Sequence, residues 1–484
     1  MLIENIYAQA QRTPDRIAVV HNNRPISYRA FARGVDAARR YLAGQELPAS
    51  GIAVLAVGSI LDGYVLGLAV RSLGMTTLLV PSMYHIRRLG RSEAHCVITT
   101  DAETWPGLHE LCTASATRLI TISAAIYADT GAGAAPALPE LPASEGGHIL
   151  LTSGTTGTHK KVLIGPSTQS QLCNFHQRVY GISEQSVVNL LHFVSGNGLG
   201  FKFSLTTWVC GGTVIFYQRS MLHQVFDYPK ITHSFLSPQA LGIILSAPSG
   251  ELHRHELMQL VVTAGPLPRA LADQARARLT SRIYTHYAST EGGPVTLTRI
   301  EQPEDLRWHR TLPSCEVQIV DDSGHLLPAG QEGLVRVRPM GGVTGYLDDA
   351  DASRTFFRGG YFYPGDLGII SPDGRLALQG RVTEVINISG IKVPAGPIEE
   401  TLQAKFGASG ACVFSTSRAD GEEILHVVFE SPQRFEPAEV VAVLRGLLPG
   451  TCRGRTHYVD DLPRNYMGKF RRDVLKAQLA GKLE

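Results

Sequence analysis

The sequence predicts an α/β protein with more than one domain. Short apolar runs typical of strands alternate with stretches whose apolar residues recur at helical spacing; the runs span 52–57, 76–80, 96–99 and 119–122. Such alternation indicates a mostly parallel sheet covered by helices. A chain of 484 residues is too long for one ordinary hydrophobic core, so we expect two or three domains.

Residues 27–44 predict a helix whose two ends are both marked. Ser27 is suited to cap its N-terminus, and Gly44 is suited to end it as a left-handed residue just past the last turn. The segment 123–147 is rich in Ala, Gly, Pro and Ser, which predicts a surface linker. The apolar run 148–151 that follows predicts a short buried strand.

The second half of the chain changes character twice. From 315 to 346, short strands and Gly-containing turns indicate a β-rich subdomain. Beyond Gly380, strands at 412–415 and 424–429 and helices at 437–448 and 469–480 indicate a compact α+β unit. We therefore predict a large N-terminal α/β domain, residues 1–380, that includes the β-rich subdomain, and a small α+β C-terminal domain, residues 381–484.

The composition argues against several classes of protein. Its 45 Lys and Arg residues against 43 Asp and Glu leave a net charge of +2, so no bulk charge favours a nucleic acid or a membrane surface as partner. Seven cysteines without a Cys-x-x-Cys pair argue against a disulfide framework or a zinc site. Neither a signal peptide nor an apolar segment of the ~20 residues that a membrane span needs is visible. We expect a cytoplasmic protein.

Residues 152–161 predict a phosphate-binding loop. The segment carries five hydroxyl side chains, two glycines and a closing lysine pair. The glycines let successive N–H groups turn toward one anion, the hydroxyls donate hydrogen bonds, and Lys160 adds positive charge. The spacing does not match Gly-x-x-x-x-Gly-Lys-Ser/Thr, which argues against a P-loop ATPase. A Thr- and Gly-rich surface turn is the ordinary alternative.

This loop is the first of five motifs that follow one another along the chain. The others are Tyr-Ala-Ser-Thr-Glu at 287–291, the turn at 360–366, the segment at 380–390 and Leu-Pro-x-x-x-x-Gly-Lys at 462–469. In order and residue type they resemble the acyl-adenylate-forming superfamily of acyl-CoA synthetases, adenylation domains and luciferases, and most of all its aryl or small-acid CoA ligases. Taken singly, residues 289–291 also fit a helix cap and Lys469 also fits a solvated surface residue.

The resemblance implies a role for each motif. Lys469 is expected to bridge the substrate carboxylate and the α-phosphate, Thr290 to contact phosphate, and Glu291 to hold Mg²⁺. The implied ATP-binding set is Thr152, Ser153, Gly154, Thr155, Thr156, Gly157, Lys160, Ala264, Gly265, Pro266, Tyr287, Thr290, Asp366, Arg381 and Lys469. The resemblance also implies that the small domain is mobile and rotates on a hinge at Thr383, which brings Ser389 and Gly390 to the thiol acceptor.

The acid is expected to lie between the segment 191–200, the turn at 263–266 and the residues near Tyr287. Candidate contacts are Phe193, Ser195, Asn197, Gly198, Thr263, His286 and Ala288. The first segment has no aspartate to hold an ammonium group, which argues against an α-amino acid and favours an aromatic or small acid. His286 has a purely structural role as its alternative.

The expected reaction is ATP- and Mg²⁺-dependent conversion of a carboxylic acid to an acyl-adenylate, followed by transfer to the thiol of CoA. Loading of a carrier protein's phosphopantetheine is the alternative, and a catalytically silent member with a binding role is a third. The presence together of Lys160, Glu291, Asp366 and Lys469 argues against the silent member. The expected partners are a small carboxylic acid and either CoA or an acyl carrier protein, without nucleic acid or membrane.

Overall fold

The computed structural model describes most of the chain. Its described residues are 2–48, 50–87, 94–128, 133–152, 160–191, 193, 196–217, 221, 224–248, 252–388, 391–417, 423–448, 453–464 and 470–479.

One sheet of the N-terminal region is mostly parallel, as the alternating pattern predicts. Its strands lie in the order β6 (Arg118–Thr121), β5 (Cys96–Thr99), β3 (Ile52–Ala56), β4 (Thr76–Leu79), β7 (His148–Thr152) and β8 (Lys160–Ile164). Each pair is parallel except β7 and β8, which pair antiparallel. The predicted phosphate loop connects β7 to β8, which are the last two strands at one side of this sheet.

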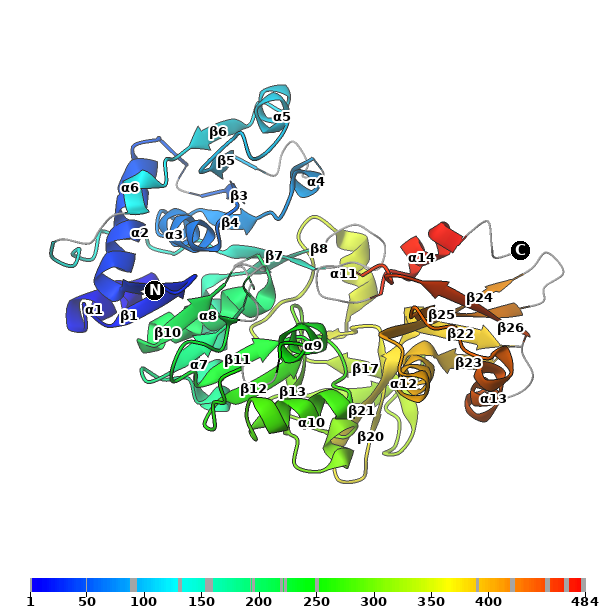
Figure 1. Cartoon of the computed structure of the whole chain (residues 1–484). Coiled ribbons are helices and arrows are strands. Elements are labelled where there is room, and N and C mark those ends of the chain that lie inside the picture. The colour runs from blue at the N-terminus through cyan, green and yellow to red at the C-terminus, as the bar shows by residue number, and fades with distance from the viewer. Residues whose placement is uncertain are drawn as a thin grey trace.

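A second N-terminal sheet carries most of the residues discussed below. Its order is β14 (Gly293–Arg299), β13 (Ile283–Ser289), β12 (Gln259–Thr263), β11 (His233–Leu236), β9 (Val187–Asn189), β10 (Thr213–Phe216), β1 (Ile17–His21) and β2 (Arg24–Ser27). The inner strands from β13 to β1 are parallel, and the two outermost pairs are antiparallel. Two helices before β10, α7 (Pro166–Tyr180) and α8 (Gly198–Cys210), pack against each other beside this sheet (Figure 1).

A third, antiparallel sheet matches the predicted β-rich subdomain. Its order is β15 (His309–Arg310), β21 (Arg375–Arg381), β20 (Asp366–Ile370), β17 (Glu332–Val337), β19 (Tyr361–Phe362) and β18 (Phe357–Arg358), and β16 (Val317–Val320) pairs with β17. In Figure 1 its yellow strands lie between the green sheet and the orange and red C-terminal elements. The remaining helices of the region up to residue 380 are α1 (Leu2–Arg12), α2 (Tyr28–Ala43), α3 (Ile60–Arg71), α4 (Met83–Ile86), α5 (Leu108–Ala114), α6 (Ala125–Ala128), α9 (Pro238–Leu245), α10 (Arg269–Arg278), α11 (Ala350–Phe356) and the 3₁₀ turn Pro303–Leu306.

The C-terminal region has its own sheet and its own core. After the 3₁₀ turn Val382–Glu384 come the hairpin β22 (Val385–Ile388) and β23 (Ile391–Pro394), and then a sheet of β24 (Gly410–Ser417), β25 (Glu423–Glu430) and β26 (Arg453–Val459). The helices are α12 (Ala395–Phe406), α13 (Pro437–Leu447) and α14 (Arg472–Leu479). Two apolar clusters of this region draw only on residues after 385, so its core is separate from those of the large region.

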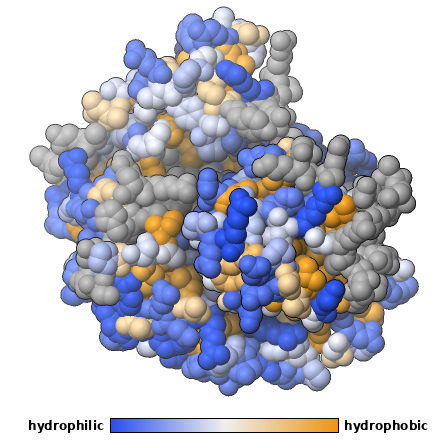
Figure 2. Space-filling view, turned by 45° about the vertical axis from the view of Figure 1, so that its right-hand side comes forward, coloured by the Kyte–Doolittle hydropathy of each residue, from blue (hydrophilic) through white to orange (hydrophobic). Residues whose placement is uncertain are grey.

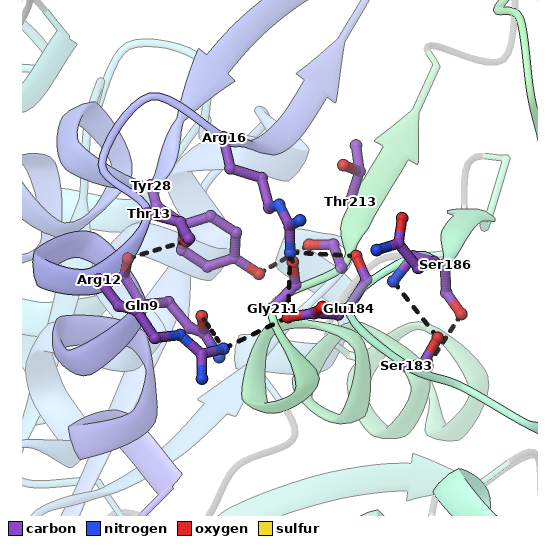
Figure 3. Close-up of polar contacts among 12 residues, drawn as sticks. Gln9, Arg12, Thr13, Arg16, Tyr28, Ser183, Glu184, Ser186, Gly211 and Thr213 are labelled. Carbon is purple, nitrogen blue, oxygen red and sulfur yellow. Dashed lines mark hydrogen bonds and ion pairs between the residues drawn. The ribbon is translucent and has the colours of Figure 1, made fainter.

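Hydrogen bonds connect the N-terminal segment to residues 184–212 (Figure 3). The Arg16 guanidinium donates to the carbonyl oxygens of Glu184 and Gly211, each at 3.4 Å. The buried Tyr28 hydroxyl donates to the carbonyl oxygen of Gly212 at 2.7 Å. The acceptor groups precede β9 (Glu184) and β10 (Gly211 and Gly212), and β1 pairs with β10 in the sheet.

Three sequence expectations need correction. Gly44 is a right-handed C-cap with φ −71°, because its amide bonds Arg40 and Leu42 in a tightened last turn. The segment 123–147 is only partly a surface linker, since α6 lies in it and Tyr127 and Glu145 are buried. The last helix begins at Arg472 rather than at 469, because Phe470 forms a β-bridge with Arg464. The cap at Ser27 is confirmed, since its hydroxyl accepts a hydrogen bond from the Ala30 amide at 3.2 Å.

The surface in Figure 2 is mostly hydrophilic, with apolar residues in small groups between polar ones. Among the described residues no helix has the length and apolar character to cross a membrane.

Candidate active site

The predicted ribose aspartate, Asp366, has a partner on each oxygen. The Tyr287 hydroxyl donates to Oδ2 at 2.5 Å, and Nε of Arg381 lies 3.1 Å from Oδ1. Asp366 opens β20 and Arg381 closes β21, where the two are register partners across the strands. Burial, and then the charge of Asp366, raises the pKa of Tyr287 well above its ordinary value, so this hydroxyl stays a donor. Three ATP-binding candidates therefore meet at one carboxylate.

The predicted metal ligand, Glu291, lies in the turn between β13 and β14 and is 8% exposed. The Tyr346 hydroxyl donates to its Oε1 at 2.9 Å. The Lys160 ammonium lies 3.5 Å from the ring centre of Phe356 and 5.1 Å from that of Tyr346. Burial lowers the pKa of Lys160, and the charge of Glu291 acts in the opposite direction. The Glu291 carboxylate and the Lys160 ammonium, which come from distant segments of the chain, thus both lie next to the Tyr346 side chain.

These residues fit a magnesium ion bound together with phosphates. Mg²⁺ in such sites takes one or two carboxylates and completes its shell with water and phosphate oxygens. Glu291 is a single buried carboxylate of that kind. The described residues hold no cluster of three or more His, Cys, Asp or Glu residues that would form an all-protein metal site.

The turn that carries Thr290 and Glu291 is a hairpin turn, so the alternative of a helix cap is wrong. Ser289 ends β13, and its hydroxyl accepts a hydrogen bond from the Gly292 amide at 2.8 Å. Gly198, the first residue of α8, faces this turn, since a Cβ placed on it would lie 3.2 Å from the Thr290 hydroxyl. The absence of a side chain at Gly198 therefore lets the helix approach Thr290 closely.

The candidate adenine-side turn follows the end of β12. Ala264 has φ +71°, a left-handed conformation that alanine adopts at a cost, while Gly265 and Pro266 are exposed. Local backbone strain of this kind persists only where surrounding contacts impose it.

The candidate acid contacts form a chain of neutral hydrogen-bonding groups. The two ring nitrogens of His286 lie 2.8 Å from the Tyr180 hydroxyl and 3.2 Å from the Thr263 hydroxyl. Burial, and then the positive charge of Lys202, lowers the pKa of His286 to about 3, so its ring is neutral at pH 7. With both nitrogens bonded, His286 has the contacts of the structural alternative, and its role toward the acid stays a prediction.

Three further candidates for the acid are described. The side chain of Asn197 caps α8 by accepting from the Gly200 amide at 2.7 Å. Phe193 is buried, and Ala288 follows a register shift in β13. None of these placements tests a contact with an acid.

Several predicted site residues lie outside the described residues. They are Ser153, Gly154, Thr155, Thr156 and Gly157 of the loop, Ser195 of the acid segment, the thiol-side pair Ser389 and Gly390, and the catalytic candidate Lys469. Thr152 is described at the end of β7, and Thr383 lies in the 3₁₀ turn that starts the C-terminal region.

Lys202 lies beside the candidate site, although the sequence motifs did not point to it. Its ammonium donates to the Thr290 carbonyl oxygen at 3.3 Å, although the two residues are 88 positions apart. The signal was present in the sequence, because Lys202 is the single charged residue in the apolar helix α8. Tyr346 and Phe356, which frame Lys160, were also not assigned to the site.

Comparison with known proteins identifies the family of the chain. Residues 6–347 match the model of the family described as AMP-binding enzyme, and the chain belongs to this family. It is 27% identical over 68% of its length to 4-coumarate–CoA ligase CCL1 of Humulus lupulus, and 23% identical over 89% to tyrocidine synthase 1 of Brevibacillus parabrevis. These alignments cover 64% and 40% of the relatives, so the chain spans less than two thirds of either.

Among solved structures, ATP-bound MatB from Rhodopseudomonas palustris has a TM-score of 0.83 at 21% identity, with 99% of each chain covered. At this identity the likeness shows the fold. It confirms the predicted α/β class, and the family match confirms the resemblance inferred from the five motifs.

Proposed function

We propose that this protein activates a carboxylic acid with ATP and transfers the acyl group to the thiol of CoA. The observation that carries the proposal is the arrangement around the β13–β14 hairpin. Tyr287 of this hairpin reaches Asp366 and its partner Arg381, while Glu291 of the same hairpin lies in the electrostatic field of Lys160. One turn thereby joins a group suited to ribose with groups suited to phosphate.

The first step needs charge neutralisation rather than a protein nucleophile. A carboxylate oxygen attacks the α-phosphorus of ATP, a phosphorus–oxygen bond breaks, and pyrophosphate leaves with its electron pair. Preorganised cations and donors stabilise such a transition state. Lys160 and Thr290 are proposed to contact phosphate, and Lys469 to contact both reacting groups. Mg²⁺ held at Glu291 would neutralise phosphate charge.

In the second step the sulfur of a thiol attacks the acyl carbon, and AMP leaves as the carbon–oxygen bond breaks. The thiol proton passes to solvent. We propose that rotation of residues 381–484 about Thr383 exchanges Lys469 for the segment at Ser389 and Gly390 between the two steps. An aromatic or small acid remains the proposed substrate class.

A carrier protein is the alternative acceptor. Tyrocidine synthase 1 matches over 89% of this chain, and the alignment covers 40% of that larger protein. A scaffold shared with a peptide synthetase is compatible with loading of a phosphopantetheine thiol. A silent binding protein is less well supported, because the chain carries Lys160, Glu291, Asp366 and Lys469 together, and the charge of Glu291 acts on Lys160.

The test is pyrophosphate release with ATP and Mg²⁺ across benzoates, cinnamates, short acids and amino acids, each with and without CoA. Turnover with one acid class, accelerated by CoA, supports the CoA ligase. Adenylate formation that CoA leaves unchanged supports a carrier protein as acceptor. Absence of pyrophosphate release with every acid contradicts the activation step itself.

A further inference from the structure

Lys202 is a buried cation that the proposed ATP chemistry does not use. It lies on α8, whose residues 200–208 are all buried, and its own exposure is 9%. An ammonium group removed from water is destabilising unless it is paired and hydrogen-bonded. An ammonium in an otherwise uncharged, buried helix is therefore expected to have a partner that offsets the cost of its burial.

The described residues provide few partners for the Lys202 ammonium. The ammonium has three donor hydrogens, and it donates one hydrogen bond, to the Thr290 carbonyl oxygen at 3.3 Å. In the described part of the chain no carboxylate oxygen lies within 4.0 Å of this nitrogen, and Glu291 acts on it from farther away. The Tyr346 hydroxyl already donates to Glu291. Among the described residues, two of the three donor hydrogens of Lys202 have no acceptor.

The helix face that carries Lys202 lies against the turn at Thr290. Gly198 and Lys202 are four residues apart and share one face of α8. A Cβ placed on Gly198 would lie 3.2 Å from the Thr290 hydroxyl and 3.8 Å from Cε of Lys202. The lysine tip therefore lies beside the turn assigned to phosphate and beside residues assigned to the acid.

The other titratable groups around Lys202 cannot balance its charge. His286 on β13 and His176 on α7 are both held neutral at pH 7, since burial first and Lys202 second lower their pKa values. The His176 ring lies 3.1 Å from the Thr206 hydroxyl, and this hydroxyl also donates to the Lys202 carbonyl oxygen at 2.8 Å. The surroundings are polar and, apart from Glu291, uncharged.

We infer that Lys202 binds a second anionic group on the substrate acid, so that the preferred substrates are dicarboxylic acids or acids with an equivalent oxyanion. The inference rests on the proposed function and narrows its substrate. An aliphatic and an aromatic diacid present the same chemistry to Lys202, and the experiment separates them.

A structural role for Lys202 gives a different expectation. If the ammonium served only to hold the Thr290 turn, its loss would weaken the fold and the turnover of every acid alike. If it is kept for the substrate, methionine at this position should leave stability equal or higher, because replacing buried charges with apolar groups is often neutral or stabilising.

The experiment compares wild type, Lys202→Met and Lys202→Arg on two matched pairs, succinate with butyrate and phthalate with benzoate. Pyrophosphate release gives kcat and KM, calorimetry gives acid binding without turnover, and thermal unfolding gives stability. The matched control is Lys476→Met, since Lys476 also donates to one backbone carbonyl oxygen, that of Ser415 at 3.4 Å, but lies on α14.

In wild type we expect kcat/KM for one diacid to exceed that for its monoacid by about 30-fold or more, mainly through KM. Lys202→Met should remove this preference in both turnover and binding without lowering the unfolding temperature. Lys202→Arg should retain a preference, and Lys476→Met should resemble wild type. The pair that responds identifies the aliphatic or the aromatic class.

Each of the other outcomes contradicts the inference about Lys202, the proposed function, or both. Equal use of both members of each pair, or an equal loss for all acids in Lys202→Met, contradicts the inference and leaves the proposed activation intact. Diacid binding that depends on Lys202 but yields no pyrophosphate supports the inference and contradicts the proposed function. If neither class binds or reacts, both are wrong.

Discussion

The nucleotide side and the acid side of the candidate site differ in the partners that their charged groups have. On the nucleotide side each carboxylate already has partners, with Asp366 between Tyr287 and Arg381 and Glu291 bonded by Tyr346. On the acid side neutral hydroxyls and imidazoles surround one ammonium, that of Lys202. Both carboxylates of the nucleotide side are thus hydrogen-bonded within the protein, whereas the role that we infer for Lys202 is to bind an anionic group of the ligand.

The largest expected effect is at Lys469, which is predicted to touch both sides. Lys469→Ala should lower pyrophosphate release about 100-fold or more, because a transition-state cation is lost, while ATP binding measured by calorimetry is retained. Lys405→Ala on the exposed face of α12 is the control. Unchanged adenylate formation would remove the catalytic role assigned to Lys469.

A second large effect should be confined to the nucleotide side. Asp366→Asn removes the charge that pairs with Arg381, and we expect KM for ATP to rise about 30-fold with little change in KM for the acid. Asp373→Asn, at an exposed aspartate that pairs with Arg375, should leave both constants unchanged. An equal rise in both KM values would show that the two sides are not separate.

On the acid side, neutral His286 makes stability depend on pH. The pKa of His286 is about 3 in the folded protein, below its ordinary value of 6.5, so at intermediate pH the unfolded chain binds a proton that the folded protein does not bind. This contribution is complete above pH 6.5 and falls by about 1.4 kcal/mol per pH unit as the pH drops toward 3.

Urea unfolding between pH 7.5 and 5 measures this contribution. His286→Gln should flatten the fall in stability by that amount, and His325→Gln, at an exposed histidine, should not. A His286→Gln protein with the slope of wild type would mean that His286 binds a proton equally in the folded and the unfolded state.

The smallest effect concerns the aromatic frame of Lys160. Phe356→Leu removes the ring whose centre lies 3.5 Å from the ammonium, and a cation–π contact contributes about 0.5–2 kcal/mol, so kcat/KM for ATP should fall by about 2- to 30-fold. Phe357→Leu is the matched control, since its ring packs on Tyr346 and Phe362. An equal loss in the control would assign the effect to packing rather than to the cation.

That the nucleotide-side candidates lie close together could be predicted from the sequence in part, because several of them occur in one short string. Tyr287, Thr290 and Glu291 lie within five positions, and one hairpin presents them together. The pairing of Asp366 with Arg381 could not be predicted, because it depends on the register of β20 against β21, which includes a shift after Leu367. Strands were visible as apolar runs, whereas the helix ends at Gly44 and Arg472 depended on local hydrogen bonds and a β-bridge.

The acid side was less predictable because its parts come from separate elements. Lys202 on α8, His176 on α7 and His286 on β13 are brought together only by the packing of the two helices beside the sheet. Nothing in the local sequence of α8 states which group the lysine will face. Helix α8 was not predicted from the sequence. A single charged residue in an apolar segment can be assigned a role only once its neighbours in the fold are known.

The pairing of β1 with β10 also has a consequence for synthesis on the ribosome. The hydroxyl of Thr213 bonds the carbonyl oxygen of Ile17 across 196 positions, so β1 emerges long before its neighbour. At about 5–20 residues per second, that separation corresponds to roughly 10–40 seconds of translation. During this time the apolar residues Ala18, Val19 and Val20 can pair with β2 but lack their partner β10, and we expect the nascent chain to need chaperone protection there.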